Sequence, residues 1–113
     1  MPSEKSFRFQ TLQRDATTNQ YPSTVEDGSY QYRHFVDVDG TDNCYYIRND
    51  GLVCRYYPNH GYDSKMYIVP TISDEYGYYL VNINGRYYMI AELLIMTFCP
   101  HLSQAKYKSN TLA

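Results

Sequence analysis

The sequence predicts a small α+β domain, in which an antiparallel sheet of about five strands built from hairpins packs against one short C-terminal helix. Three observations predict it. Short runs of aromatic and β-branched residues alternate with glycine-containing turns, and an Asn-Gly pair at 84–85 separates two such runs. An apolar helical stripe follows the last run and ends at Pro100. A chain of 113 residues suffices for one domain with a small core.

Residues 1–29 are rich in Ser, Thr, Gln and Asp and lack a sustained apolar period, so we expect a flexible polar arm. Its aromatic residues Phe7 and Phe9 could anchor it to the domain or to another chain, or stay exposed. From residue 30 the composition changes, and residues 30–38 are typical of a first strand that ends at a turn at 39–40. We therefore predict a single domain at 30–100 and a frayed tail at 101–113.

Residues 44–57 have the pattern of a hairpin around Asn49-Asp50-Gly51. A two-residue loop would pair Ile47 with Cys54, whereas a three-residue loop with a bulge at Gly51 would pair Ile47 with Val53. The choice matters because a one-residue slip sends every side chain to the other face. We favour the bulged form, because it brings Ile47 and Val53 together in the core.

The second half of the chain predicts a strand at 65–72, bent or at an edge because of Pro70, and a hairpin at 78–90 around the Asn-Gly turn. A helix should follow at 91–98. One face of this hairpin is the more apolar and should lie against the helix. That face carries Tyr79, Val81, Ile83, Tyr88 and Ile90, and the helix stripe consists of Leu93, Leu94, Thr97 and Phe98.

Composition limits the class of protein. The chain has fifteen tyrosines and no tryptophan, which suits a half-exposed sheet, a contact surface or a platform for stacking bases. Its net charge is −2, which is neither the basic charge of a dedicated nucleic-acid binder nor the strong acidity of a DNA mimic. Three cysteines, no charged-then-apolar leader and no apolar run long enough to cross a bilayer predict a soluble protein in a reducing cytoplasm.

Two segments resemble the DNA-associated N-terminal module of phage-type HNH homing endonucleases. Residues 46–53, Tyr-Ile-Arg-Asn-Asp-Gly-Leu-Val, are similar to that module's opening strand, Asn-x-Gly turn and following valine. Residues 78–98 are similar to its tyrosine-rich strand, Asn-Gly turn, aromatic strand and leucine-rich helix ending in Phe. The resemblance covers about half of the chain and implies a role at DNA.

The sequence also departs from that family. Ala91 and Glu92 stand where the family usually has a His-Arg pair, and the residues after Phe98 are too few for the ββα-metal nuclease centre. His101 and Asn110 match that centre by residue type, but no second histidine follows. We therefore expect no enzyme activity and no catalytic residue, although a truncated nuclease remnant is a further interpretation.

Arginines that neighbour tyrosines in sequence are the candidate contacts to nucleic acid. Arginine can hold phosphate while tyrosine rings stack on bases. The same pattern also suits cross-strand pairs on the solvated face of a sheet. The candidate nucleic-acid-binding residues are Arg48, Arg55, Tyr56, Tyr57, Arg86 and Tyr87.

The sequence gives no strong sign of a metal or cofactor site. Cys99 and His101 only loosely approach zinc-ligand spacing, and residues 37–42 only faintly resemble a calcium loop. No glycine-rich phosphate loop is present. The remaining cysteines and histidines are expected to be buried thiols and surface imidazoles (Cys44, Cys54, His34 and His60).

The function predicted from the sequence is a non-catalytic nucleic-acid-binding module with DNA or RNA as its partner. The alternative is a protein-interaction or assembly subunit of a phage or mobile element, whose arm orders on a protein partner. We expect no cofactor, no small-molecule substrate and no membrane contact.

Overall fold

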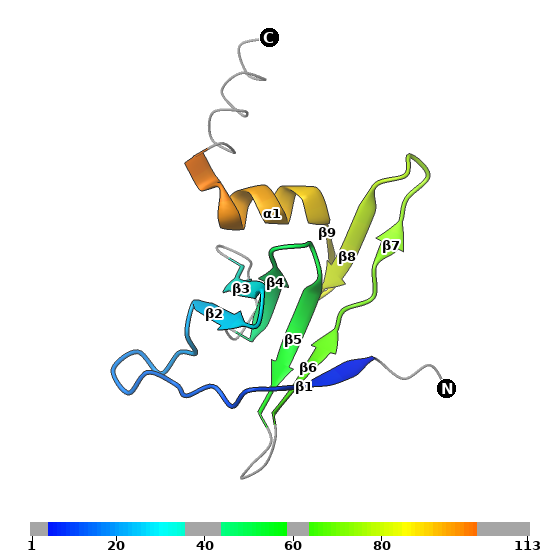
Figure 1. Cartoon of the computed structure of the whole chain (residues 1–113). Coiled ribbons are helices and arrows are strands. Elements are labelled where there is room, and N and C mark those ends of the chain that lie inside the picture. The colour runs from blue at the N-terminus through cyan, green and yellow to red at the C-terminus, as the bar shows by residue number, and fades with distance from the viewer. Residues whose placement is uncertain (1–4, 36–43, 59–63, 102–113) are drawn as a thin grey trace.

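A computed structural model gives the fold, and it describes residues 5–35, 44–58 and 64–101. Within these ranges the chain forms nine strands in two antiparallel sheets and one C-terminal helix, which confirms the predicted α+β class with more strands than expected (Figure 1). The elements are β1 Ser6–Phe9, β2 Thr24–Asp27, β3 Tyr30–His34, β4 Tyr45–Arg48, β5 Val53–Tyr57, β6 Ser64–Ile68, β7 Ile72–Ser73, β8 Tyr79–Ile83, β9 Arg86–Met89 and α1 Ile90–Phe98.

The larger sheet has the strand order β1-β6-β5-β4-β3-β2 and the smaller sheet has the order β7-β8-β9. The large sheet curls, so that its two edge strands approach each other: the Gln10 side chain donates a hydrogen bond to the Glu26 carbonyl oxygen at 2.9 Å. Pro70 lies between β6 and β7, where the chain leaves one sheet for the other. A proline suits that place because it has no amide hydrogen for a ladder.

Residues 5–29 correct the expectation of an arm, because they supply both edge strands of the large sheet. β1 pairs with β6, and Phe9 is only 4% exposed. The segment between β1 and β2 covers one face of the sheet with Leu12 and Tyr21, both buried. Few but well-spaced apolar side chains therefore hold this polar segment in place, since each buries its surface against a strand that is far away in sequence.

Two cores lie on opposite faces of the large sheet, because alternate residues of each strand point to opposite sides. The first core is lined by buried tyrosines and is closed by residues 10–23. The second core lies between the large sheet, the small sheet and α1, which contacts β3, β4, β8 and β9 (Figure 1). The first contains Phe9, Leu12, Tyr21, Val25, Tyr32, Tyr46, Cys54, Tyr56 and Met66, and the second contains Phe35, Cys44, Tyr45, Ile47, Val53, Val81, Ile83 and Leu93.

Both predicted hairpins are confirmed in register. Ile47 pairs with Val53, and Gly51 at the bulge has a φ of 99°. In the second hairpin, Asn84 and Gly85 have φ values of 54° and 85°, as a two-residue turn of this hand requires. The helix is confirmed within one residue, and its stripe faces the second core.

One residue of the predicted inner face is misplaced. Tyr79 shares a face with the buried Val81, yet it is 63% exposed. It stands at the first position of β8, beyond the part of the small sheet that packs into the second core. The proposed acidic turn at 37–42, the loop residue His60 and tail residues 102–113 lie outside the described ranges.

Candidate nucleic-acid interface

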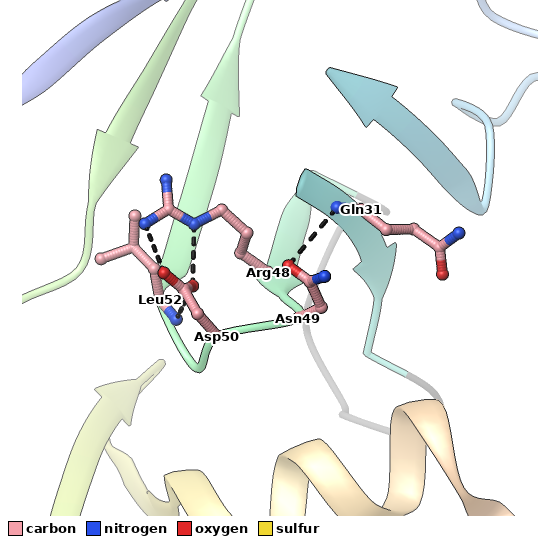
Figure 2. Close-up of polar contacts among 5 residues, drawn as sticks. All are labelled: Gln31, Arg48, Asn49, Asp50 and Leu52. Atoms are coloured by element: carbon pink, nitrogen blue, oxygen red, sulfur yellow. Dashed lines mark hydrogen bonds and ion pairs between the residues drawn. The ribbon is translucent and has the colours of Figure 1, made fainter. Parts of the chain in front are cut away.

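Arg48 is the last residue of β4, and its side chain is paired with Asp50 in the turn of the first hairpin (Figure 2). Its Nε and Nη2 donate hydrogen bonds to the two carboxylate oxygens of Asp50 at 2.8 and 2.7 Å, and its guanidinium lies 3.8 Å from the centre of the Tyr30 ring. The same Asp50 carboxylate accepts a hydrogen bond from the Leu52 amide at 3.3 Å. The hydrogen bond from Arg48 lowers the pKa of Asp50. The predicted phosphate ligand Arg48 is therefore already held by a carboxylate.

A groove of about 510 Å³ lies beside this ion pair, between the first hairpin, the start of β8 and the start of α1. Arg48 and Asp50, at the edge of this groove, form an ion pair with each other. Most of its other walls are apolar or aromatic, so the groove is better suited to contact with apolar or aromatic groups than to catalysis. Its lining includes Leu52, Tyr78, Tyr79, Met89, Ile90 and Leu94.

Tyr56, a predicted stacking residue, is not at the surface. It is 1% exposed and belongs to the first core. Its hydroxyl donates to Ser64 Oγ at 2.9 Å and accepts from the Leu12 amide at 2.8 Å. In a strand the neighbouring positions face opposite sides, so only one residue of the Tyr56-Tyr57 pair can reach solvent. That residue is Tyr57, which is 37% exposed.

Arg55 and Tyr57 lie together on the outer side of β5. The Arg55 guanidinium is 4.8 Å from the centre of the Tyr57 ring and 5.3 Å from that of Tyr45. The Tyr57 ring meets Tyr67 edge-to-face, with 4.7 Å between ring centres. These contacts place Arg55 against two tyrosine rings, with the third ring, Tyr67, next to Tyr57.

The strand register adds two cations that sequence reasoning missed. Lys65 of β6 stands opposite Tyr57 on one side and opposite Arg8 of β1 on the other. Cross-strand partners share a face of a sheet, so these side chains continue the surface of Arg55. We call this surface the Arg-Tyr face and define it as Arg8, Tyr45, Arg55, Tyr57, Lys65 and Tyr67.

The charge of the Arg-Tyr face is one-sided. Its three charged members are all cations, on three strands that lie side by side (Figure 1). Arg8 and Lys65 are exposed and stand directly opposite each other on adjacent strands. The net acidity of the whole chain thus coexists with a locally basic surface.

The remaining predicted residues, Arg86 and Tyr87, lie on β9 of the small sheet. Tyr87 is 61% exposed and stands opposite Asn82, a residue that lines a small pocket together with Arg55. Arg86 stands opposite the buried Ile83, on the other face of the small sheet. Tyr87 therefore shares a face of the small sheet with Asn82, and Arg86 lies on the opposite face of that sheet.

A signal for the missed residues was present in the sequence. Phe7-Arg8-Phe9 and Lys65-Met66-Tyr67 both alternate between polar and large apolar side chains, as half-buried strands do. In the structure, Phe9 and Met66 face the first core, while Arg8 and Lys65 are exposed. This alternation predicts which residues of each strand are exposed. It does not predict that β1 pairs with β6, a segment more than fifty residues further along the chain.

The part of the chain that the structure describes contains no assembled metal site. No three ligand-type side chains gather there, although His60 is outside the described ranges. Burial raises the pKa of the Cys54 thiol to about 12, so its thiolate is scarce at neutral pH. Likewise, no helix in the described ranges is long and apolar enough to span a membrane.

Comparison of the chain with protein-family models, curated proteins and solved structures found no match.

Proposed function

We propose that the chain is a non-catalytic nucleic-acid-binding module and that the Arg-Tyr face is its contact surface. The observation that carries the proposal is the gathering of Arg8, Arg55 and Lys65 on adjacent strands, among partly exposed tyrosine rings. Cations that follow a surface can neutralise successive phosphates, and tyrosine rings beside them can stack on bases.

The resemblance to the DNA-associated module of HNH homing endonucleases supports the same proposal. It rests on residues 46–53 and 78–98, which form the two hairpins and the helix. In this proposal Arg48 stabilises the first hairpin, while Arg55 and Tyr57 contact nucleic acid. Tyr87 extends the contact from the small sheet, and Arg86 lies outside it.

The test is binding of labelled single-stranded and duplex DNA and RNA at low salt, measured by fluorescence anisotropy. The Arg55→Ala/Lys65→Ala variant should bind much more weakly than the wild type, since hydrogen bonds to charged groups contribute about 1.5–3 kcal/mol each. The matched control is Arg14→Ala, because Arg14 lies over Tyr21 on the segment that covers the other face of the sheet. Absence of binding by the wild type at low salt would refute the proposal.

A second candidate function is a protein-interaction or assembly subunit. The observation that favours it is the exposure of large side chains on the small sheet and its turns, next to the 510 Å³ groove. Affinity purification from the native source separates the two candidates: a stoichiometric protein partner without nucleic acid would favour this one. The exposed side chains are Ile72, Tyr76, Tyr78, Tyr79 and Tyr87.

A further inference from the structure

Among the strand residues that the structure describes, one face of the small sheet carries no charge. Cross-strand partners share a face, and alternate residues of a strand point to opposite sides. Val81 of β8 is buried in the second core, so its neighbours Leu80 and Asn82 point to the other side, together with the residues that stand opposite them. We call this side the outer face and define it as Ile72, Leu80, Asn82, Tyr87 and Met89.

The outer face is more apolar than the exposed side of a sheet usually is. An antiparallel sheet with one face on a core normally presents polar side chains to water on its other face. Here Tyr87 is 61% exposed and Ile72 is 41% exposed. Exposed apolar surface of this kind is typical of a contact surface for a ligand or partner.

The outer face adjoins the Arg-Tyr face at a small pocket. Asn82 lines this pocket of about 150 Å³ together with Arg55 and Tyr57. Tyr87 stands directly opposite Asn82, and residues in such a position have Cβ atoms about 5 Å apart. The exposed Tyr87 ring therefore lies one cross-strand position from a residue that shares a pocket with the cationic face. This continuity favours one ligand that contacts both faces over a separate protein partner for the outer face.

The two faces offer different chemistry to that ligand. Arg8, Arg55 and Lys65 supply positive charge, whereas the outer face supplies an exposed ring and apolar surface without charge. Single-stranded nucleic acid has the matching groups, because its phosphates are charged and its bases present flat faces that stack on aromatic side chains. In a duplex those flat faces are stacked on each other, and only the base edges are reached through the grooves.

We propose that the Arg-Tyr face and the outer face together bind single-stranded nucleic acid in preference to duplex. This inference rests on the proposed function and names its substrate class. The phosphates contact the three cations of the Arg-Tyr face, and one base stacks on the Tyr87 ring.

The experiment compares three labelled probes of equal length by fluorescence anisotropy at low salt. They are single-stranded oligothymidine, its duplex with oligoadenine, and a strand of abasic sites with the same number of phosphates. We expect the wild type to bind oligothymidine at least about tenfold more tightly than the abasic strand, as one stacked base predicts. It should also bind oligothymidine more tightly than the duplex.

The variant Tyr87→Ala should bind oligothymidine about tenfold more weakly than the wild type and should bind the abasic strand equally well. Its salt dependence should be that of the wild type, because the ring carries no charge. Tyr87→Phe keeps the ring and should retain the affinity. The matched control is Tyr76→Ala, because Tyr76 is 77% exposed on the turn between β7 and β8, outside both faces.

Three results would overturn the inference and leave the proposed function standing. They are equal binding of oligothymidine and the abasic strand, unchanged affinity of Tyr87→Ala for oligothymidine, and a duplex that binds as tightly as the single strand. Failure of every probe to bind would overturn both.

Discussion

At the scale of the residue, tyrosine serves two purposes that its abundance alone does not separate. Tyr46 and Tyr56 are buried, and their hydroxyls find partners: Tyr46 donates to the Pro22 carbonyl oxygen at 2.8 Å, and Tyr56 bonds to Ser64 and Leu12. Burial raises the pKa of the Tyr46 hydroxyl. Tyr57, one position further on, lies at the surface, so the first of these two neighbouring tyrosines packs in the core and the second is exposed.

The change Tyr56→Phe should therefore reduce stability and leave binding unaltered. It deprives the buried Leu12 amide and the Ser64 hydroxyl of a partner, which should lower the free energy of unfolding by about 1–3 kcal/mol. Urea unfolding measures this loss. Its counterpart Tyr57→Ala should weaken nucleic-acid binding by about 1–3 kcal/mol, as expected for one lost stacking ring. Weaker binding by a fully stable Tyr56→Phe variant would contradict this assignment.

The Arg48–Asp50 pair predicts how stability depends on pH. Because Arg48 lowers the pKa of Asp50 in the folded state, the pair stabilises the fold above the ordinary aspartate pKa of about 3.9. This contribution is lost as the pH falls through the lower folded pKa. The Asp50 side chain is 45% exposed, so the effect should stay below about 1 kcal/mol. Urea unfolding of wild type and Asp50→Asn should differ at pH 7 and converge near pH 2; an equal difference at both would refute it.

At the scale of the element, β1 is part of the sheet and not an appendage. It pairs with β6 through four residues, and its Phe9 ring lies 5.0 Å from Tyr32 and 6.2 Å from Tyr56. The strand also carries Arg8 on its outer side. β1 therefore contributes Phe9 to the first core on one side of the sheet and Arg8 to the Arg-Tyr face on the other.

We predict that Phe9→Ala lowers the free energy of unfolding by about 3–5 kcal/mol, the usual cost of emptying a buried phenylalanine site. Phe7→Ala is the matched control and should cost less, because Phe7 is only partly buried against the same core. Chemical denaturation followed by circular dichroism measures both. Equal and small losses would mean that β1 contributes little to the fold.

At the scale of the whole molecule, local contacts were predictable and distant ones were not. The turns at Gly51 and at Asn84-Gly85 fixed two hairpin registers, since turn geometry decides them within a few residues. The pairing of β1 with β6 joins segments more than fifty residues apart, and no short pattern specifies it. For this reason the sequence singled out Arg55 and Tyr57 but could not show that Arg8 and Lys65 adjoin them. It also placed Tyr56 at the surface, whereas Tyr56 is buried.

We propose that three cations on adjacent strands bind the phosphates of a nucleic acid, and the salt dependence of binding tests this proposal. The logarithm of the binding constant for single-stranded DNA should fall against the logarithm of salt concentration with a slope of about −2, as three phosphate contacts predict. The triple variant Arg8→Ala/Arg55→Ala/Lys65→Ala should have a slope near zero, and Arg14→Ala should keep that of the wild type. An unchanged slope in the triple variant would contradict the claim.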